Sequence, residues 1–249
     1  MKRLGVRALA LAAMFLHATP ETVPAATFTV NPIQVFLSRR AASALLTLRN
    51  ESPDTLRFEL TVFAWSQAPS GEMKLEPTRD IVLFPSLLTL KPSEERRVRV
   101  GHVTVPGARE KTYRVFVKEM PPIDGTSAGG VRVLTNMGIP VFVRPDKEVA
   151  TASLEALRQH DGRLEFVLAN TGTVHVVPQR IRVRGLAGTS QVFEQPLPGW
   201  YVLASSRRDF SVAVPADTCR RLTTLTVHVE FGSASLEESL HTPGGACGQ

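Results

Sequence analysis

Apolar and polar residues alternate along most of this chain, in short runs that end at Pro, Gly, Asn or Asp. This period of two is typical of β-strands with one buried face, because successive side chains of a strand point to opposite sides of the sheet. Helical periodicity with capping residues is missing. The first half of the chain is predicted to form strands at Phe28–Leu37, Ala44–Leu48, Leu56–Trp65, Ile81–Phe84, Arg97–Val103, Thr112–Glu119 and Val131–Val143. The second half is predicted to form strands at Leu164–Leu168, Val174–Val183, Gln191–Phe193, Asp209–Val214, Leu222–Phe231 and Ser235–Leu240.

A break at Arg144-Pro145-Asp146 divides these strands into two similar halves. The strand that ends at Asn50 has a counterpart that ends at Asn170, and turn residues follow both asparagines. Many short strands at regular spacing are typical of β-sandwiches and barrels. We therefore expect an all-β protein made of two tandem sandwich domains of about a hundred residues each.

The N-terminus has the pattern of a secretory signal. Positive charge at Lys2 and Arg3 precedes an apolar run that is too short to anchor the chain in a bilayer, and a small-residue cleavage site ends at Ala25. We expect a signal peptide at residues 1–25, a first domain at 26–145 and a second at 146–249. No later stretch is long and apolar enough to span a membrane, so stable membrane insertion is not expected.

The composition bears on the expected partners and on the state of the cysteines. The formal net charge is +6, but the basic residues are scattered and no nucleic-acid-binding motif occurs, so nucleic acid is not an expected partner. The two cysteines, Cys219 and Cys247, would usually pair in the oxidising compartment that export implies, although two separate thiols remain the alternative.

Catalytic and metal-binding motifs are weak or missing. Residues Gly125–Gly129 match G-x-S-x-G around Ser127, but that motif needs a strand-to-helix turn, and here prolines precede it and a β run follows. The six histidines lack metal-binding spacing, and no phosphate-binding or dinucleotide-binding loop occurs. We expect no enzyme activity, no metal and no cofactor.

The run Val131–Val143 is longer than the usual strand, and almost all its odd-numbered residues are apolar. One interpretation is an ordinary core strand. The other is that part of the apolar face stays exposed and pairs with a partner as an added strand.

Several short stretches occur in a distinctive order and spacing: Phe28–Pro32 (FTVNP), Leu45–Asn50 (LLTLRN), Leu90–Glu95 (LKPSEE) with Val98–Val100 (VRV), Lys118–Pro122 (KEMPP) and Pro140–Pro145 (PVFVRP). Together they resemble the signature stretches of the PapD-like pilus chaperones, a family with a sandwich fold that complements its partners with a β-strand. The resemblance covers nearly all of the expected mature chain and is strongest in the first domain.

The resemblance implies two immunoglobulin-like domains in an L shape and a periplasmic chaperone. Such a chaperone lends its long strand to pilus or fimbrial subunits that lack their last strand, and passes them to an outer-membrane usher. The implied subunit-binding face is Val131, Val133, Thr135, Met137 and Ile139. The implied ion pairs between the domains involve Glu119, Arg144 and Glu230.

The sequence departs from the family at the site that holds the subunit's C-terminal carboxylate. The two positions that are basic in well-known members are Gln34 and Pro140 here. Another cation could bind this carboxylate, and the candidates are Arg39, Arg40 and Lys118. Otherwise the carboxylate is held in a different way.

Two other functions remain as alternatives. An exported adhesion or surface-structural protein could also consist of two immunoglobulin-like domains, but no anchoring signal is visible. A secreted hydrolase that uses Ser127 lacks the required structural context.

Overall fold

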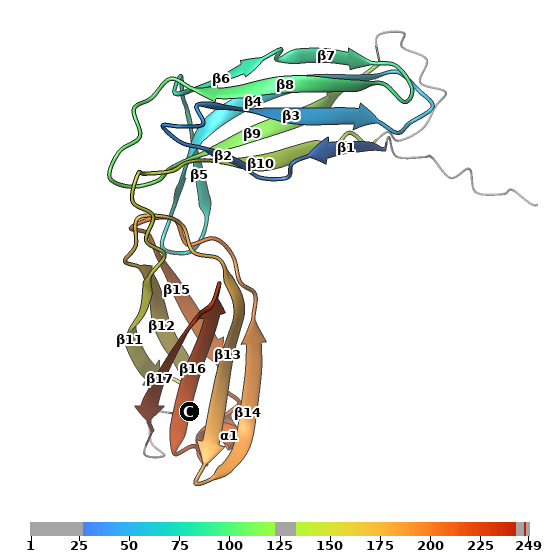
Figure 1. The fold of residues 1–249 in the computed structure, drawn as a ribbon. Coiled ribbons are helices and arrows are strands. Elements are labelled where there is room, and N and C mark those ends of the chain that lie inside the picture. The colour runs from blue at the N-terminus through green and yellow to red at the C-terminus, as the bar shows by residue number, and fades with distance from the viewer. Residues whose placement is uncertain (1–26, 123–132, 243–246, 248–249) are drawn as a thin grey trace, which may run out of the picture.

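The computed structural model describes residues 27–122, 133–242 and 247. It has two units built of β-strands that meet at an elbow, so the molecule is L-shaped, as expected (Figure 1). The expected signal peptide at residues 1–25 and the loop 123–130 with Ser127 lie outside the described residues. The prediction of an all-β protein with two tandem sandwiches is confirmed.

The first unit is a sandwich of two sheets. One sheet contains, in spatial order, β1 (Phe28–Asn31), β3 (Ser43–Asn50), β8 (Glu95–His102) and β6 (Ile81–Phe84). The other contains β2 (Val35–Leu37), β10 (Asn136–Val143), β9 (Lys111–Met120), β4 (Leu56–Gln67) and β5 (Met73–Pro77), with β7 (Leu87–Leu90) also on β4. The pairs are antiparallel except that β2 and β10 run parallel.

Alternating side chains of both sheets fill the space between them. Leu46 and Leu48 of β3 and Val115 and Val117 of β9 are fully buried, whereas their neighbours along each strand turn outward or are partly exposed. This is the burial that the period of two predicted.

The first predicted strand is divided between the two sheets. β1 pairs with β3, and β2 pairs with β10 in the other sheet. Pro32 lies at the crossing, after a cis peptide bond with Asn31. Because proline has no backbone N–H to donate, it suits a place where the strand leaves one ladder before it joins the next.

The second unit is also a sandwich. One sheet contains β11 (Ala152–His160), β12 (Arg163–Asn170) and β15 (Arg207–Ala213). The other contains β14 (Ser190–Leu197), β13 (Pro178–Ala187), β16 (Thr224–Phe231) and β17 (Ala234–His241). Its core packs Phe166 and Leu168 of β12 against Val183 of β13 and Val227 of β16.

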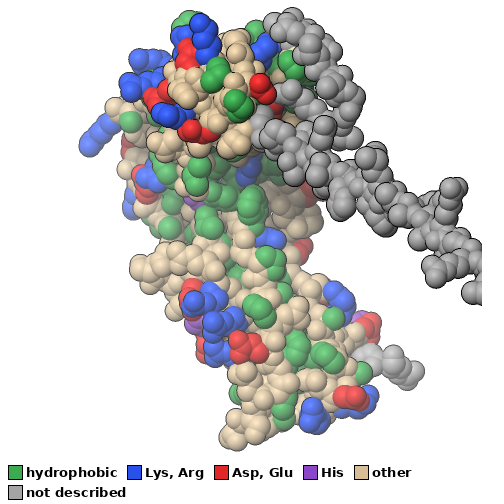
Figure 2. Space-filling model, turned by 90° about the vertical axis from the view of Figure 1, so that its right-hand side faces the viewer, with side chains coloured by type: hydrophobic (Ala, Val, Ile, Leu, Met, Phe, Trp, Pro, Cys, Tyr) green, Lys and Arg blue, Asp and Glu red, His purple; other side chains and the backbone are tan. Residues whose placement is uncertain are grey.

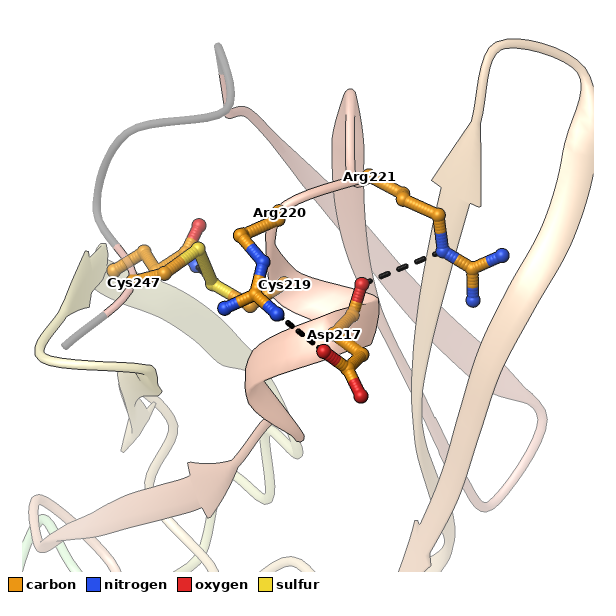
Figure 3. The surroundings of a disulfide bond; sticks show 6 residues. Asp217, Cys219, Arg220, Arg221 and Cys247 are labelled. Atoms are coloured by element: carbon orange, nitrogen blue, oxygen red, sulfur yellow. Dashed lines mark hydrogen bonds and ion pairs between the residues drawn. A yellow bond between two sulfur atoms is a disulfide. The ribbon is translucent and has the colours of Figure 1, made fainter. Parts of the chain in front are cut away.

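The predicted disulfide is present between Cys219 and Cys247, whose Cα atoms are 5.8 Å apart (Figure 3). Cys219 ends the short helix α1 (Ala216–Cys219), and Asp217 of this helix pairs with Arg220, the residue that follows it. Within the described ranges, no helix is long and apolar enough to cross a membrane.

Replacing Cys247 with serine is expected to lower the free energy of unfolding by about 2–4 kcal/mol, because the disulfide then no longer restricts the unfolded chain. The bond joins residues 28 positions apart. Urea unfolding of the purified variant measures the loss. The matched control is the wild-type protein with reductant, which should lose a similar amount; equal stability of oxidised and reduced protein would contradict the prediction.

Candidate functional site

The odd-numbered residues that lead into β10 pass from solvent to core. Val133 is 64% exposed, Thr135 and Met137 are partly buried, and Ile139 is 1% exposed. Met137 packs against the core, and Ile139 belongs to it. Of the expected subunit-binding residues, Val131 lies outside the described ranges. The structure therefore places Val133 at the surface and Met137 at the border between surface and core. Ile139 is an ordinary core residue of the first unit.

One edge of β10 is only partly covered. β9 pairs with β10 along its whole length, from Asn136 to Val143. On the other edge, β2 pairs only with Val141–Val143. In the part of the chain that the structure describes, no strand pairs with this edge from Asn136 to Pro140. An open edge of this kind can accept an added strand.

Glu119 of β9 supports the segment before β10. Its side chain is fully buried, and its carboxylate accepts a hydrogen bond from the backbone N–H of Thr135 (3.2 Å). The backbone N–H of Glu119 donates to the carbonyl of Thr135 (2.8 Å). Pairing with β9 therefore continues to Thr135, and the alternation of side chains continues with it.

The expected ion-pair network of Glu119, Arg144 and Glu230 does not form. Val143, which precedes Arg144, pairs with Lys111 of β9. Glu119 lies eight residues further along β9, roughly 26 Å away at about 3.3 Å per residue. The three side chains thus cannot meet.

Arg144 and Glu230 have other partners. The Arg144 guanidinium is 3.2 Å from Glu148 and lies over the ring of Phe36, 4.0 Å from its centre. Glu230 binds Arg180 on the neighbouring strand (2.6 Å), and this hydrogen bond holds the pKa of the Glu230 carboxyl below its ordinary value.

A cluster of buried, mostly aromatic side chains joins the two units instead. Trp65 and Phe142 of the first unit pack with Tyr201 and Leu203 of the second, and all four are at most 9% exposed. His175 of the second unit stacks on Phe142 with ring centres 3.9 Å apart. Figure 2 shows hydrophobic side chains gathered deep in the elbow.

Polar contacts fix the same junction. The Glu110 carboxylate is buried and binds both the backbone N–H of His175 (3.1 Å) and its ring Nδ1 (2.7 Å). The hairpin of β4 and β5 reaches the second unit, where the Gln67 amide donates to the carbonyl of Tyr201 (2.7 Å). Asp209 donates its backbone N–H to the carbonyl of Pro69 in this hairpin (2.8 Å).

The candidates for a carboxylate anchor do not converge. Gln34 lies at the junction, where its amide donates to the Tyr201 hydroxyl. Arg39 is exposed and pairs with Asp146 (3.3 Å), and Arg40 is exposed. Lys118 is exposed at the far end of β9, opposite Asn136.

Sequence reasoning missed the residues of the junction. Trp65, Phe142, His175 and Tyr201 are far apart in the chain, so no local pattern connects them. One signal was available at Ile139–Val143, where an apolar run without alternation indicates a strand buried on both faces. Val141 and Val143 turn to the core, and Phe142 turns to the second unit.

Comparison with known proteins identifies the first unit. Residues 27–148 match the family described as pili and flagellar-assembly chaperone, PapD N-terminal domain. The first unit belongs to the PapD-like chaperone family. At the level of sequence, no curated protein matches the chain.

Solved structures of pilus chaperones share the two-unit fold of this PapD-like chain. CsuC of Acinetobacter baumannii, in complex with the CsuE tip subunit, is 18% identical over 86% of this chain and 98% of that chain, with a TM-score of 0.62. SafB, in complex with the Salmonella enterica SafA pilin, is 15% identical over 88% and 99%, with a TM-score of 0.57. DraB of E. coli is 18% identical over 87% and 100%, with a TM-score of 0.55.

Proposed function

We propose that this protein is a periplasmic chaperone that binds incomplete pilus subunits along β10 and delivers them to an outer-membrane usher. The observation that carries the proposal is the open edge of β10 beside the apolar side chains of Val133 and Met137. Family membership supports it, since CsuC and SafB are described as complexes of a chaperone with a tip subunit or a pilin.

The physical basis is the pairing of two incomplete surfaces. A subunit that lacks its last strand exposes backbone groups and an apolar groove. A strand lent by the chaperone forms hydrogen bonds with these backbone groups, and its apolar side chains bury the groove. Residues two apart point to the same face, so Val133, Thr135 and Met137 would enter successive pockets of one groove. Thr135 would then occupy a shallower or more polar pocket.

The test is co-purification of a tagged chaperone with a pilus subunit of the same organism, expressed in the same cells. Val133→Arg is expected to reduce the recovered complex at least tenfold, because an arginine would enter an apolar pocket without a counterion. The fold should survive, since Val133 is exposed. Met137→Arg is less informative, because Met137 also packs on the core of the free protein.

Leu134→Arg is the matched control. Leu134 is the next residue, is also exposed and lies on the opposite face by alternation. It should leave both thermal unfolding and subunit capture near the wild-type values. Equal capture by the Val133 and Leu134 variants would rule out a role for this face in filling a groove.

A further inference from the structure

Glu119 of β9 holds the segment that leads into β10 at two points. The residue is 0% exposed, and its carboxylate accepts a hydrogen bond from the backbone N–H of Thr135 (3.2 Å). The backbone N–H of Glu119 donates to the carbonyl of Thr135 (2.8 Å). A buried carboxylate is costly unless it is hydrogen-bonded, and its bond to an N–H is stronger than a bond between neutral groups. Thr135 is therefore tied to β9 through both of its backbone polar groups.

This contact is the last full pair that β9 can form with the segment. The register of β9 and β10 places Thr135 directly opposite Glu119, and two residues earlier it places Val133 opposite Pro121. Proline has no backbone N–H, so Pro121 cannot donate a hydrogen bond to Val133. Glu119 is thus the terminal support of this segment on β9.

The tie to β9 decides where the neighbouring backbone groups point. In an antiparallel ladder, residues whose N–H and C=O face the partner strand alternate with residues whose groups face the other edge. Because the groups of Thr135 face β9, those of Leu134 and Asn136 face the open edge. The same alternation holds at the far end of β10, where the backbone N–H of Arg144 donates to a carbonyl of β2. The hold on Thr135 therefore carries the open edge past the first residue of β10.

The side chains of the segment follow the same alternation. Val133, Thr135 and Met137 lie on one face, and Leu134 and Asn136 lie on the other. Val133 is 64% exposed, so its own packing does little to keep it on its face. The backbone bonds of Thr135 supply this restraint, since a turn of the chain before β10 would exchange the two faces.

From this geometry we infer that Glu119 is a positioning residue for subunit capture. It aligns the backbone of Leu134 and the side chain of Val133 as a strand before the partner arrives. The inference rests on the proposed function and names the residue that prepares the free end of the binding edge. Binding to a strand that is already formed costs less conformational entropy than binding that must order the strand. Because Glu119 is buried, it acts without contact with the subunit.

The first measurement needs only the free protein. Glu119→Leu removes the acceptor of the Thr135 N–H, and an apolar side chain of similar size suits the buried position. We expect the amide hydrogen of Thr135 to exchange at least tenfold faster in this variant, because the segment then opens more often. Glu119→Gln, which keeps a carbonyl oxygen as the acceptor, should retain most of the protection.

The second measurement is co-purification of tagged variants with a pilus subunit of the same organism, expressed in the same cells. Glu119→Leu should reduce the recovered complex about tenfold, the effect of one lost hydrogen bond of ordinary strength. Glu119→Gln should recover most of the complex.

Asn50→Ala is the matched control for lost stability, because it removes hydrogen bonds in a turn of the same unit. It should capture the subunit as the wild type does and leave the exchange of Thr135 unchanged. Thermal unfolding confirms that all three variants are folded.

Three results would overturn the inference and leave the proposed function standing. They are an unchanged exchange rate of Thr135 in Glu119→Leu, wild-type capture by Glu119→Leu, and a loss of capture in Glu119→Gln or Asn50→Ala as large as that in Glu119→Leu. If the wild-type protein captures no subunit at all, both the proposed function and this inference are wrong.

Discussion

Replacing Phe142 with alanine should lower the free energy of unfolding by about 3–5 kcal/mol, the usual cost of removing a large buried aromatic side chain. Phe142 is fully buried between the two units. It stacks on Phe36 with ring centres 5.5 Å apart and on His175 at 3.9 Å, and it also contacts Trp65 and Tyr201. The alanine variant leaves a cavity that rigid strands on both sides cannot close.

Urea unfolding measures this loss, and fluorescence of the buried Trp65 reports whether the junction opens first. Phe84→Ala is the matched control, because Phe84 is 75% exposed in the same unit and its loss should change stability by no more than about 0.5 kcal/mol. If both variants lose the same small amount, the aromatic cluster does not stabilise the elbow.

The second large effect is expected at Asn50, whose substitution by alanine should cost about 3 kcal/mol. The buried side-chain amide donates to the carbonyls of Asp54 (2.7 Å), Leu90 (3.0 Å) and Lys91 (3.1 Å). Its oxygen accepts from the backbone N–H of Ser52 (2.8 Å). Alanine would leave several backbone groups without partners, at about 1–3 kcal/mol for each that stays buried.

Asn170→Ala should have a similar effect in the second unit. The Asn170 amide donates to the carbonyls of Val174 (2.9 Å) and Val202 (2.8 Å), and its oxygen accepts from Gly172 (2.9 Å). Hydrogen exchange separates the two variants, since each should lose protection mainly in its own unit. Asn136→Ala, at an exposed position, serves as the control for stability; a loss as large as that of Asn50→Ala would refute the hydrogen-bond argument.

The paired asparagines show what the sequence could predict. Asn50 and Asn170 end strands in the two halves, and the structure gives both the same role of closing the turn that follows. The two-sandwich fold followed from such local signals. Strands without alternation were missed: all five residues of β5 are exposed, and β11 contains a bulge near Ala156, which has a positive φ.

Two further strands begin later than predicted. The start of a strand depends on the backbone groups that pair with it, and the sequence does not show these partners. The strand expected from Val174 begins at Pro178, because Val176 forms only an isolated bridge with Val202. The strand expected at Val131–Val143 begins at Asn136 among the described residues, and Val131 itself lies outside them. The burial of Arg114 was missed for a similar reason: it lies against the ring of Trp200 in the second unit, which only the elbow brings near it.

The disulfide also determines where this protein can be immobilised or labelled. It holds Cys247 against α1, which lies at the end of the second unit away from the elbow (Figure 1). An affinity handle or fluorophore fused after Gln249 begins two residues beyond this tether. Such a fusion would attach the protein to a sensor surface by that end of the second unit and leave the open edge of β10 facing solution.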